Sequence, residues 1–155
     1  SYSGDLGPKL KEGDRQSPEG FYAVDQAAMN PNSSYHLSFN LGFPNQFDKA
    51  NQRSGSFLMV HGDCVSVGCY AMTDAGIEEI YLIVQAAQLG GQRSVPVHAF
   101  PFRMTHERLT LEQDSAWFEY WQSLKLGYEY FENERVPPAV SARGRKYVFS
   151  SSINQ

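Results

Sequence analysis

No stretch of this 155-residue sequence is apolar over the ~18 residues that a membrane-spanning helix needs. No cluster of lysine and arginine exceeds a few residues, and the formal net charge is −4. Because the phosphate backbone of nucleic acids favours proteins with a basic face, this charge argues against a nucleic-acid partner. No internal repeat, low-complexity linker or signal peptide is recognisable, although a trimmed mature chain would also lack a signal. We therefore expect one ordinary folded domain without a transmembrane segment.

The sequence has only two cysteines, Cys64 and Cys69, five positions apart. A disulfide between them would close a very small loop and would add little stability. The pair could instead bind a metal, or one thiol could react while the other is a bystander. The redox compartment of the protein cannot be predicted from this count.

Aromatic residues are abundant, with nine Tyr, ten Phe and two Trp, which suits a sheet-rich core or a lined groove. From Tyr35 to Leu41, apolar and polar residues alternate, which predicts a strand with one buried face. The continuous apolar run 57–60 predicts a strand covered on both faces that ends at His61-Gly62. Further strands are predicted at 21–24, 95–102 and 146–150.

Two helices are predicted in the second half of the chain. Thr73 or Asp74 can cap the first, whose apolar residues share one face, and Gly90-Gly91 ends it. The second runs from about residue 115 to 133 and ends before Pro137-Pro138. These elements predict an α+β fold with a β-rich catalytic core and flanking helices. We expect a single domain over residues 1–155, with a helical portion at about 105–136.

The stretch VHGDCVSVGCYAMTD, residues 60–74, carries the most chemical information. A strand delivers His61, and Gly68-Cys69 lies just ahead of a predicted helix. A thiol must be ionised to attack, and both a neighbouring imidazole and a positive helix end favour the thiolate. Backbone N–H groups around Gly68 and Cys69 could then stabilise an oxyanion. The Cys–His pair by itself only suggests nucleophilic catalysis, because a cysteine near a histidine is often inert packing.

A His-Gly pair at the end of a strand, followed by Ser-x-Gly-Cys, resembles the signature of the YkuD-type L,D-transpeptidases. The segments GDRQSPEGFY upstream and FPFRMT downstream resemble the YafK-like branch of that family. The resemblance extends from GPKLKEGD to the PPAV and KYVF segments, which is nearly the whole chain.

This resemblance implies a role for each matching residue. Cys69 would form the acyl-enzyme, and His61 would accept the thiol proton. Gly62 would hold the imidazole through its backbone carbonyl, while Ser66 and Gly68 would shape the anion pocket. Two features depart from the familiar pattern: only three residues separate His-Gly from the serine, and Ala71 stands where Arg or Asn is common.

The family implies a cysteine acyl-enzyme that acts on peptidoglycan stem peptides, at the carbonyl of the L-centre of meso-diaminopimelate. We favour a hydrolytic peptidoglycan–lipoprotein amidase, which cleaves the bond between diaminopimelate and the terminal lysine of Braun's lipoprotein. The alternative is a transpeptidase that forms cross-links or attaches the lipoprotein. The implied location is the periplasm or cell envelope of a Gram-negative bacterium, and no cofactor is expected.

Several residues allow more than one interpretation. Tyr35 and His36 could line the substrate groove, or His36 could be an ordinary strand histidine. Arg53 could bind a substrate carboxylate bidentately, or be a solvated loop arginine. Cys64 is interpreted as a small residue packed under its loop. A different class of function, a non-catalytic wall-binding or zinc-stapled module, would use His61, Cys64, Cys69 and His98 as ligands.

Overall fold

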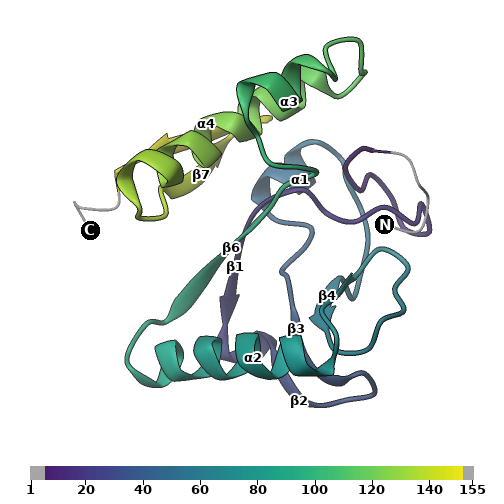
Figure 1. The fold of residues 1–155 in the computed structure, drawn as a ribbon, viewed down its shortest axis with the longest axis vertical. Coiled ribbons are helices and arrows are strands. Elements are labelled where there is room, and N and C mark those ends of the chain that lie inside the picture. The colour runs from purple at the N-terminus through teal and green to yellow at the C-terminus, as the bar shows by residue number, and fades with distance from the viewer. Residues whose placement is uncertain (1–5, 152–155) are drawn as a thin grey trace.

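The computed structural model describes residues 6–151, and within them the chain forms three small sheets and four α-helices (Figure 1). The largest sheet has the strand order β2–β3–β4–β5. Strands β2 (Met29–Ser33), β3 (His36–Asn40) and β4 (Met59–His61) are antiparallel neighbours, and β5 (Tyr70–Ala71) runs parallel to β4. This mixture of helices and sheets is consistent with the predicted α+β class. The expectation of a single domain over residues 1–155 stays a prediction, and its two ends lie outside the described residues.

Helix α2 (Asp74–Leu89) packs along one face of the largest sheet and against β6. Its predicted boundaries are confirmed: the Thr73 side chain accepts a hydrogen bond from the N–H of Gly76, and Gly90 follows the last turn. Ile77, Tyr81 and Val84 bury the predicted apolar face against residues such as Phe39 and Val60. This packing occupies one face of the sheet and leaves the other face for a site.

Strands β1 (Gly20–Asp25) and β6 (Ser94–Ala99) form an antiparallel ribbon that runs between the layer of α2 and the layer of α4 (Figure 1). A short 3₁₀ turn, Gln26–Ala28, joins β1 to β2. Strand β6 is shorter than predicted and ends at Ala99. Proline lacks the N–H donor of a ladder, and Pro96 is tolerated because each strand of a two-stranded ribbon has a free edge.

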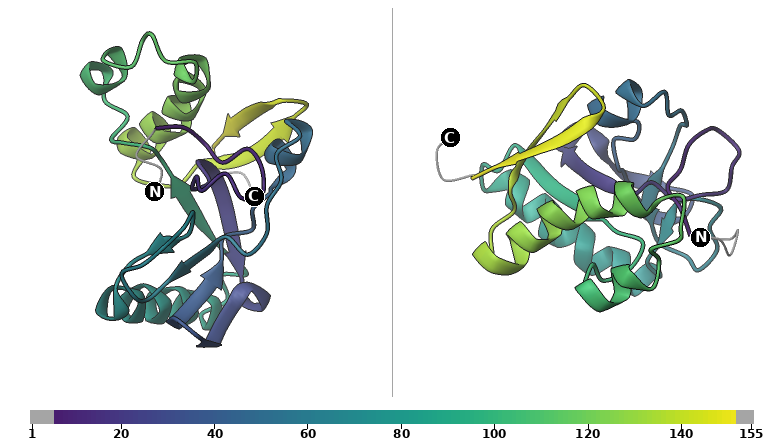
Figure 2. Two further views of the ribbon diagram at one scale, coloured as in Figure 1. Left: turned by 90° about the vertical axis from the view of Figure 1, so that its right-hand side faces the viewer. Right: turned by 90° about the horizontal axis from the view of Figure 1, so that it is seen from above.

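The remaining elements form a second layer, seen from two sides in Figure 2. They are α1 (Gln46–Ala50), α3 (His106–Thr110), α4 (Phe118–Glu134), β7 (Ala139–Arg143) and β8 (Lys146–Ser150). Helix α4 begins three residues later than predicted, whereas β8 matches its predicted bounds. Trp121 and Leu124 of α4 are fully buried together with Phe21 of β1. Gly127 leaves α4 without a side chain where the rings of Phe21 and Phe149 press against it.

Buried polar groups link this layer to the rest of the chain. The guanidinium of Arg53 donates to Asp48 at 3.0 Å and to the hydroxyl of Tyr120 at 3.1 Å. Asp48 is fully buried, and burial raises its pKa even though Arg53 opposes the shift. The carboxylate of Glu19 accepts a hydrogen bond from the indole N–H of Trp121 at 2.8 Å, and burial raises the pKa of Glu19 to about 7.

The prediction that residues 57–60 form a strand covered on both faces is wrong, because the strand is shorter and only one of its faces is buried. Phe57 is 78% exposed and adopts a positive φ of 54°, and the strand begins only at Met59. Leu58 and Val60 are buried in the core under α2, while Met59 faces the other side of the sheet. The side chains of this apolar run therefore alternate between the buried core and an open groove.

Candidate active site

A groove of about 430 Å³ lies on the face of the sheet that α2 does not cover, and both Cys69 and His61 line it. A volume in the range of ~300–1,000 Å³ is typical of ligand sites. The other lining residues come from β2, the β2–β3 turn, β3, β4 and the loop before Cys69: Asn30, Ser33, Ser34, Tyr35, Ser38, Phe57, Met59, Val65, Ser66 and Val67.

The register of β4 and β5 brings the thiol and the imidazole to the same face. His61 pairs with Ala71 in this parallel ladder, so Cys69, two residues earlier, lies level with Met59. Side chains alternate between the two faces of a strand, which places Cys69 and Ala71 on the side of Met59 and His61. The hydrogen-bond contact between the N–H of Met59 and Sγ of Cys69, at 3.4 Å, agrees with this register.

The imidazole of His61 is held in one tautomer. Its Nδ1 lies 2.5 Å from the carbonyl oxygen of Gly62, and since a carbonyl only accepts, Nδ1 must carry the proton. Nε2 is then the basic nitrogen. The ring is almost completely buried, with a residue exposure of 3%. This arrangement of carbonyl and imidazole is the one that a proton acceptor next to a thiol needs.

Gly62 is packed too tightly to carry a side chain. A Cβ atom at this position would lie 2.6 Å from Oδ1 of Asp74 and 2.7 Å from the carbonyl oxygen of Tyr35. Its N–H donates to the carbonyl oxygens of Tyr35 and Leu37, both at 3.1 Å. These contacts fix the peptide whose carbonyl holds His61.

The sulfur of Cys69 has two backbone neighbours. It lies 3.4 Å from the N–H of Met59, which can donate to a thiolate, and 3.4 Å from the carbonyl of Phe57, which can accept from a thiol. The predicted helix does not begin directly after Cys69, because β5 intervenes and Thr73 caps α2. The local support for a thiolate thus comes from a strand N–H, while the imidazole of His61 lines the same groove.

The loop before Cys69 is held by two further contacts. The hydroxyl of Ser66 donates to the carbonyl of Cys69 at 2.7 Å. Gly68 adopts a φ of +89° and lies so close to the carbonyl oxygen of Gln16 that a Cβ would be 2.9 Å from it. Both residues therefore shape the backbone around the sulfur.

Tyr35 and His36 point to different places. The ring of Tyr35 lies in the groove with its centroid 4.9 Å from that of His61. His36 lies outside the groove lining, and its Nε2 is 2.7 Å from a carboxylate oxygen of Glu78 on α2. Of the two residues, only Tyr35 is placed to contact a ligand near His61.

Arg53 is not placed to bind a substrate carboxylate. It is 9% exposed, its guanidinium is already paired with Asp48, and it lies over the ring of Tyr120 at 4.4 Å from the centroid. It is absent from the groove lining. The interpretation as a substrate ligand is therefore wrong in this structure, because the buried carboxylate of Asp48 captures the cation.

The structure supports neither the predicted packing of Cys64 under its loop nor the zinc alternative. Cys64 is exposed, so it does not pack under its loop. His98 lies on β6 among aromatic rings, next to Phe21 and Phe100. Across residues 6–151, no group of three or more His, Cys, Asp or Glu side chains is arranged to hold a metal ion.

Several residues that line the groove are not predicted as site residues from the sequence. Ser38 belongs to the predicted polar face of its strand, but it is 1% exposed and lies directly opposite His61. Phe57, Val65 and Val67 form an exposed apolar rim. The alternation of residues 35–41 indicates which face Ser38 occupies, whereas its burial depends on strands that are distant in sequence.

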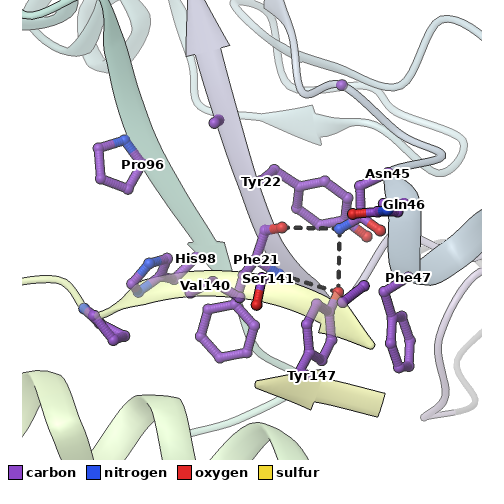
Figure 3. A pocket seen from close by; sticks show the side chains of 14 residues that line it. Phe21, Tyr22, Asn45, Gln46, Phe47, Pro96, His98, Val140, Ser141 and Tyr147 are labelled. Atoms are coloured by element: carbon purple, nitrogen blue, oxygen red, sulfur yellow. Dashed lines mark hydrogen bonds between the residues drawn. The ribbon is translucent and has the colours of Figure 1, made fainter. Parts of the chain in front are cut away.

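A second cavity, of about 340 Å³, lies between β1, β6, α1 and β7 (Figure 3). There the side-chain amide of Asn45 donates to the carbonyl of Phe21 at 2.8 Å and to the hydroxyl of Tyr147 at 3.2 Å. Neither Cys69 nor His61 lines this cavity. The groove at Cys69 is the candidate active site because it brings a nucleophile and a base together.

Comparisons with known proteins identify the family of this chain. Residues 3–98 match the model of the YkuD family, described as the L,D-transpeptidase catalytic domain. The chain is 48% identical, over 99% of its length, to YafK of Escherichia coli K12, a proposed L,D-transpeptidase, and equally to YafK of strain O157:H7. It spans 62% of the length of these curated relatives.

Among solved structures, the chain is similar to the helical cell shape determining protein Pgp2 of Campylobacter jejuni. The TM-score is 0.46 at 20% identity, over 91% of this chain and 61% of that one. Across residues 6–151, no helix is long and apolar enough to cross a membrane. On the strength of the family match and the identity to YafK, the chain belongs to the YkuD family of L,D-transpeptidase catalytic domains.

Proposed function

We propose that this chain is a cysteine acyl-transfer enzyme that acts on peptidoglycan stem peptides, with Cys69 as nucleophile and His61 as base. One observation supports the roles most directly. The thiol and the imidazole share one face of the sheet, and the Gly62 carbonyl holds Nδ1 so that Nε2 is the basic nitrogen. Family membership supports the substrate class.

The reaction begins when Nε2 of His61 takes the proton of the Cys69 thiol. The thiolate attacks the carbonyl at the L-centre of diaminopimelate, and the carbonyl oxygen becomes an oxyanion beside the Gly68–Cys69 backbone. When the C–N bond breaks, the imidazolium returns its proton to the leaving amine. The product is a thioester on Cys69, and His61 is again neutral.

The fate of this thioester defines the activity. We favour hydrolysis: His61 takes a proton from water, the hydroxide attacks the thioester, and the proton returns to the Cys69 sulfur as the carboxylic acid leaves and then ionises in water. The small Ala71 supports this assignment, whereas the description of YafK as a proposed L,D-transpeptidase supports the transpeptidase alternative. Ala71 lies opposite His61 in the sheet, at a position where the family pattern often carries Arg or Asn.

The shape of the groove suits an extended peptide. Phe57, Val65 and Val67 present exposed apolar side chains along its rim, and Tyr35 adds an aromatic ring beside His61. Such a rim contacts the stem of a substrate while its carbonyl lies over the sulfur. This substrate places the enzyme in the periplasm or cell envelope of a Gram-negative bacterium, with Braun's lipoprotein as the proposed source of the leaving lysine.

The test uses purified protein and muropeptides that carry the C-terminal lysine peptide of the lipoprotein, with products analysed by mass spectrometry. Hydrolysis predicts free tripeptide stems and released lysine peptide. Formation of new diaminopimelate cross-links would contradict the amidase and support a transpeptidase. The two free cysteines provide matched variants: Cys69→Ala should abolish product, and Cys64→Ser should retain it.

Intact-mass measurement separates an enzyme from a binding module. A carbapenem or muropeptide should add one acyl group to the wild type and to Cys64→Ser, but none to Cys69→Ala. If no variant forms an adduct and Cys69→Ala binds wall fragments as the wild type does, the proposal is wrong and a non-catalytic module is supported.

A further inference from the structure

A buried hydroxyl without a partner lies beside the proposed base. Ser38 of β3 is 1% exposed, and its Oγ has no hydrogen-bond partner among residues 6–151. Most buried polar side chains in proteins are hydrogen-bonded, and an unpaired one is destabilising. The exception here lies in the lining of the groove that contains Cys69 and His61.

The strand register places this hydroxyl next to the imidazole. Ser38 pairs with His61 across the antiparallel ladder of β3 and β4. The N–H of Gly62 donates to the carbonyl of Leu37, and the N–H of Leu41 donates to the carbonyl of Leu58. Leu37 with Gly62 and Leu41 with Leu58 are therefore hydrogen-bonded pairs of this ladder. Ser38 and His61 form a non-hydrogen-bonded pair, whose Cα atoms are only about 4.5 Å apart. Side chains of such a pair point to the same face of the sheet and are close neighbours.

The two protonation states of His61 differ in the hydrogen bond that the ring offers to the Ser38 hydroxyl. Nδ1 of His61 is already bonded to Gly62, which leaves Nε2 as the ring's other polar atom. When Nε2 takes the proton of Cys69, the ring gains a positive charge and Nε2 becomes a donor. A hydroxyl oxygen can accept that hydrogen bond, and the register places Ser38 on the same face of the sheet as His61. Neutral Nε2 can accept from the hydroxyl, but the structure shows no such bond, and a hydrogen bond to the charged ring is the stronger of the two.

We propose that Ser38 is a positioning residue that stabilises the imidazolium form of His61 and so raises the fraction of Cys69 present as thiolate. The inference rests on the proposed roles of Cys69 and His61. The proton moves from Sγ to Nε2 and later to the leaving amine, while the Ser38 hydroxyl keeps its own proton throughout.

Other titratable groups surround the ring. Cys69 faces it from the start of β5 and Tyr35 from the turn before β3. Asp74 and His36, the latter paired with Glu78, lie behind Gly62. All of these groups are unchanged when Ser38 is replaced, so a changed pH profile would report the hydroxyl.

The experiment measures alkylation of Cys69 by iodoacetamide from pH 5 to pH 10, using intact mass. A Cys64→Ser background leaves one reactive cysteine. For Ser38→Ala we expect alkylation about tenfold slower at pH 7 and nearly unchanged at pH 10, because a hydrogen bond to a charged group is lost. Ser38→Thr keeps the hydroxyl and should retain most of the rate, and Ser141→Ala on the distant strand β7 is the control.

Melting temperature provides a second readout that a purely structural role would not match. Removing an unpaired buried hydroxyl also removes its desolvation penalty, so Ser38→Ala should melt at or above the wild-type temperature while reacting more slowly. If Ser38→Thr does not fold, the melting temperature and the alkylation rate of Ser38→Ala together still test the role of Ser38.

The failures of the two proposals can be distinguished with His61→Gln. If His61→Gln slows alkylation and Ser38→Ala follows the wild-type profile at every pH, the role of Ser38 is wrong and the Cys–His pair stands. If His61→Gln itself has no effect on alkylation, the proposed base is wrong, and the inference about Ser38 falls with it.

Discussion

Replacing Arg53 separates its two assigned roles, substrate ligand and internal ion pair. In the structure, Arg53→Ala removes the 3.0 Å contact to Asp48 and the 3.1 Å hydrogen bond to Tyr120. Breaking a buried ion pair by removing one partner typically costs about 3–5 kcal/mol, because the other charge stays buried. We expect the free energy of unfolding to fall by about this amount.

Urea denaturation followed by tryptophan fluorescence measures the change. With a urea dependence of about 2 kcal/mol per molar, the midpoint should fall by about 2 M. The deficit should be smaller at pH 5 than at pH 8: Arg53 lowers the pKa of Asp48, so without it that carboxyl takes up a proton more readily. A second substitution, Asp48→Asn, removes the unpaired charge and should recover part of the loss.

Arg93→Ala is the matched control, because Arg93 is exposed and its loss should change the midpoint little. The reasoning would be refuted if Arg53→Ala unfolded at the wild-type urea concentration and instead raised the KM for a muropeptide. That result would restore Arg53 as a substrate ligand.

Two further predictions concern the packing of the second layer. The pKa of Glu19 is raised to about 7 in the folded chain from an ordinary value of 4.5. Between pH 4.5 and pH 7 the folded chain keeps this proton and the unfolded chain releases it. The free energy of unfolding therefore falls as pH rises through this range. Glu19→Gln, which keeps an acceptor for Trp121, should therefore be more stable than the wild type at pH 8 by about 3 kcal/mol, and the two should converge near pH 4.5 in urea titrations. Gly127→Ala should lower the melting temperature, with a cost of about 1–3 kcal/mol, because its methyl group would strike Phe21 and Phe149. A melting temperature above that of the wild type would show that ordinary helix propensity dominates instead.

Local patterns in the sequence predicted the elements whose boundaries depend on local chemistry. The bounds of α2 follow from the cap at Thr73 and the stop at Gly90, and β8 follows from its own residues. The placement of His61 at the end of a strand, before the loop that leads to Gly68-Cys69, is also a local property. The family resemblance then supplied the roles that spacing alone could not.

The sequence could not predict which side chains would meet from distant segments. Arg53 lies in a polar loop, and only the folded chain brings Tyr120 and a buried Asp48 to it. Phe57 is apolar, yet its positive φ turns it out to the groove rim. Ser38 falls on the polar face of its predicted strand, and its burial is a consequence of β4 and the groove loops.

The contacts of Arg53, Glu19 and Phe21 have a consequence for how the family diversifies. The family match ends at residue 98, but these three residues, all before that point, are completed by Tyr120, Trp121 and Phe149 beyond it. The part of the chain that matches the family model therefore packs specifically against the part that follows it. A relative that carries a different C-terminal layer should have exchanged positions 19, 21 and 53 together, and a graft of this layer onto another member should need the same three residues to fold.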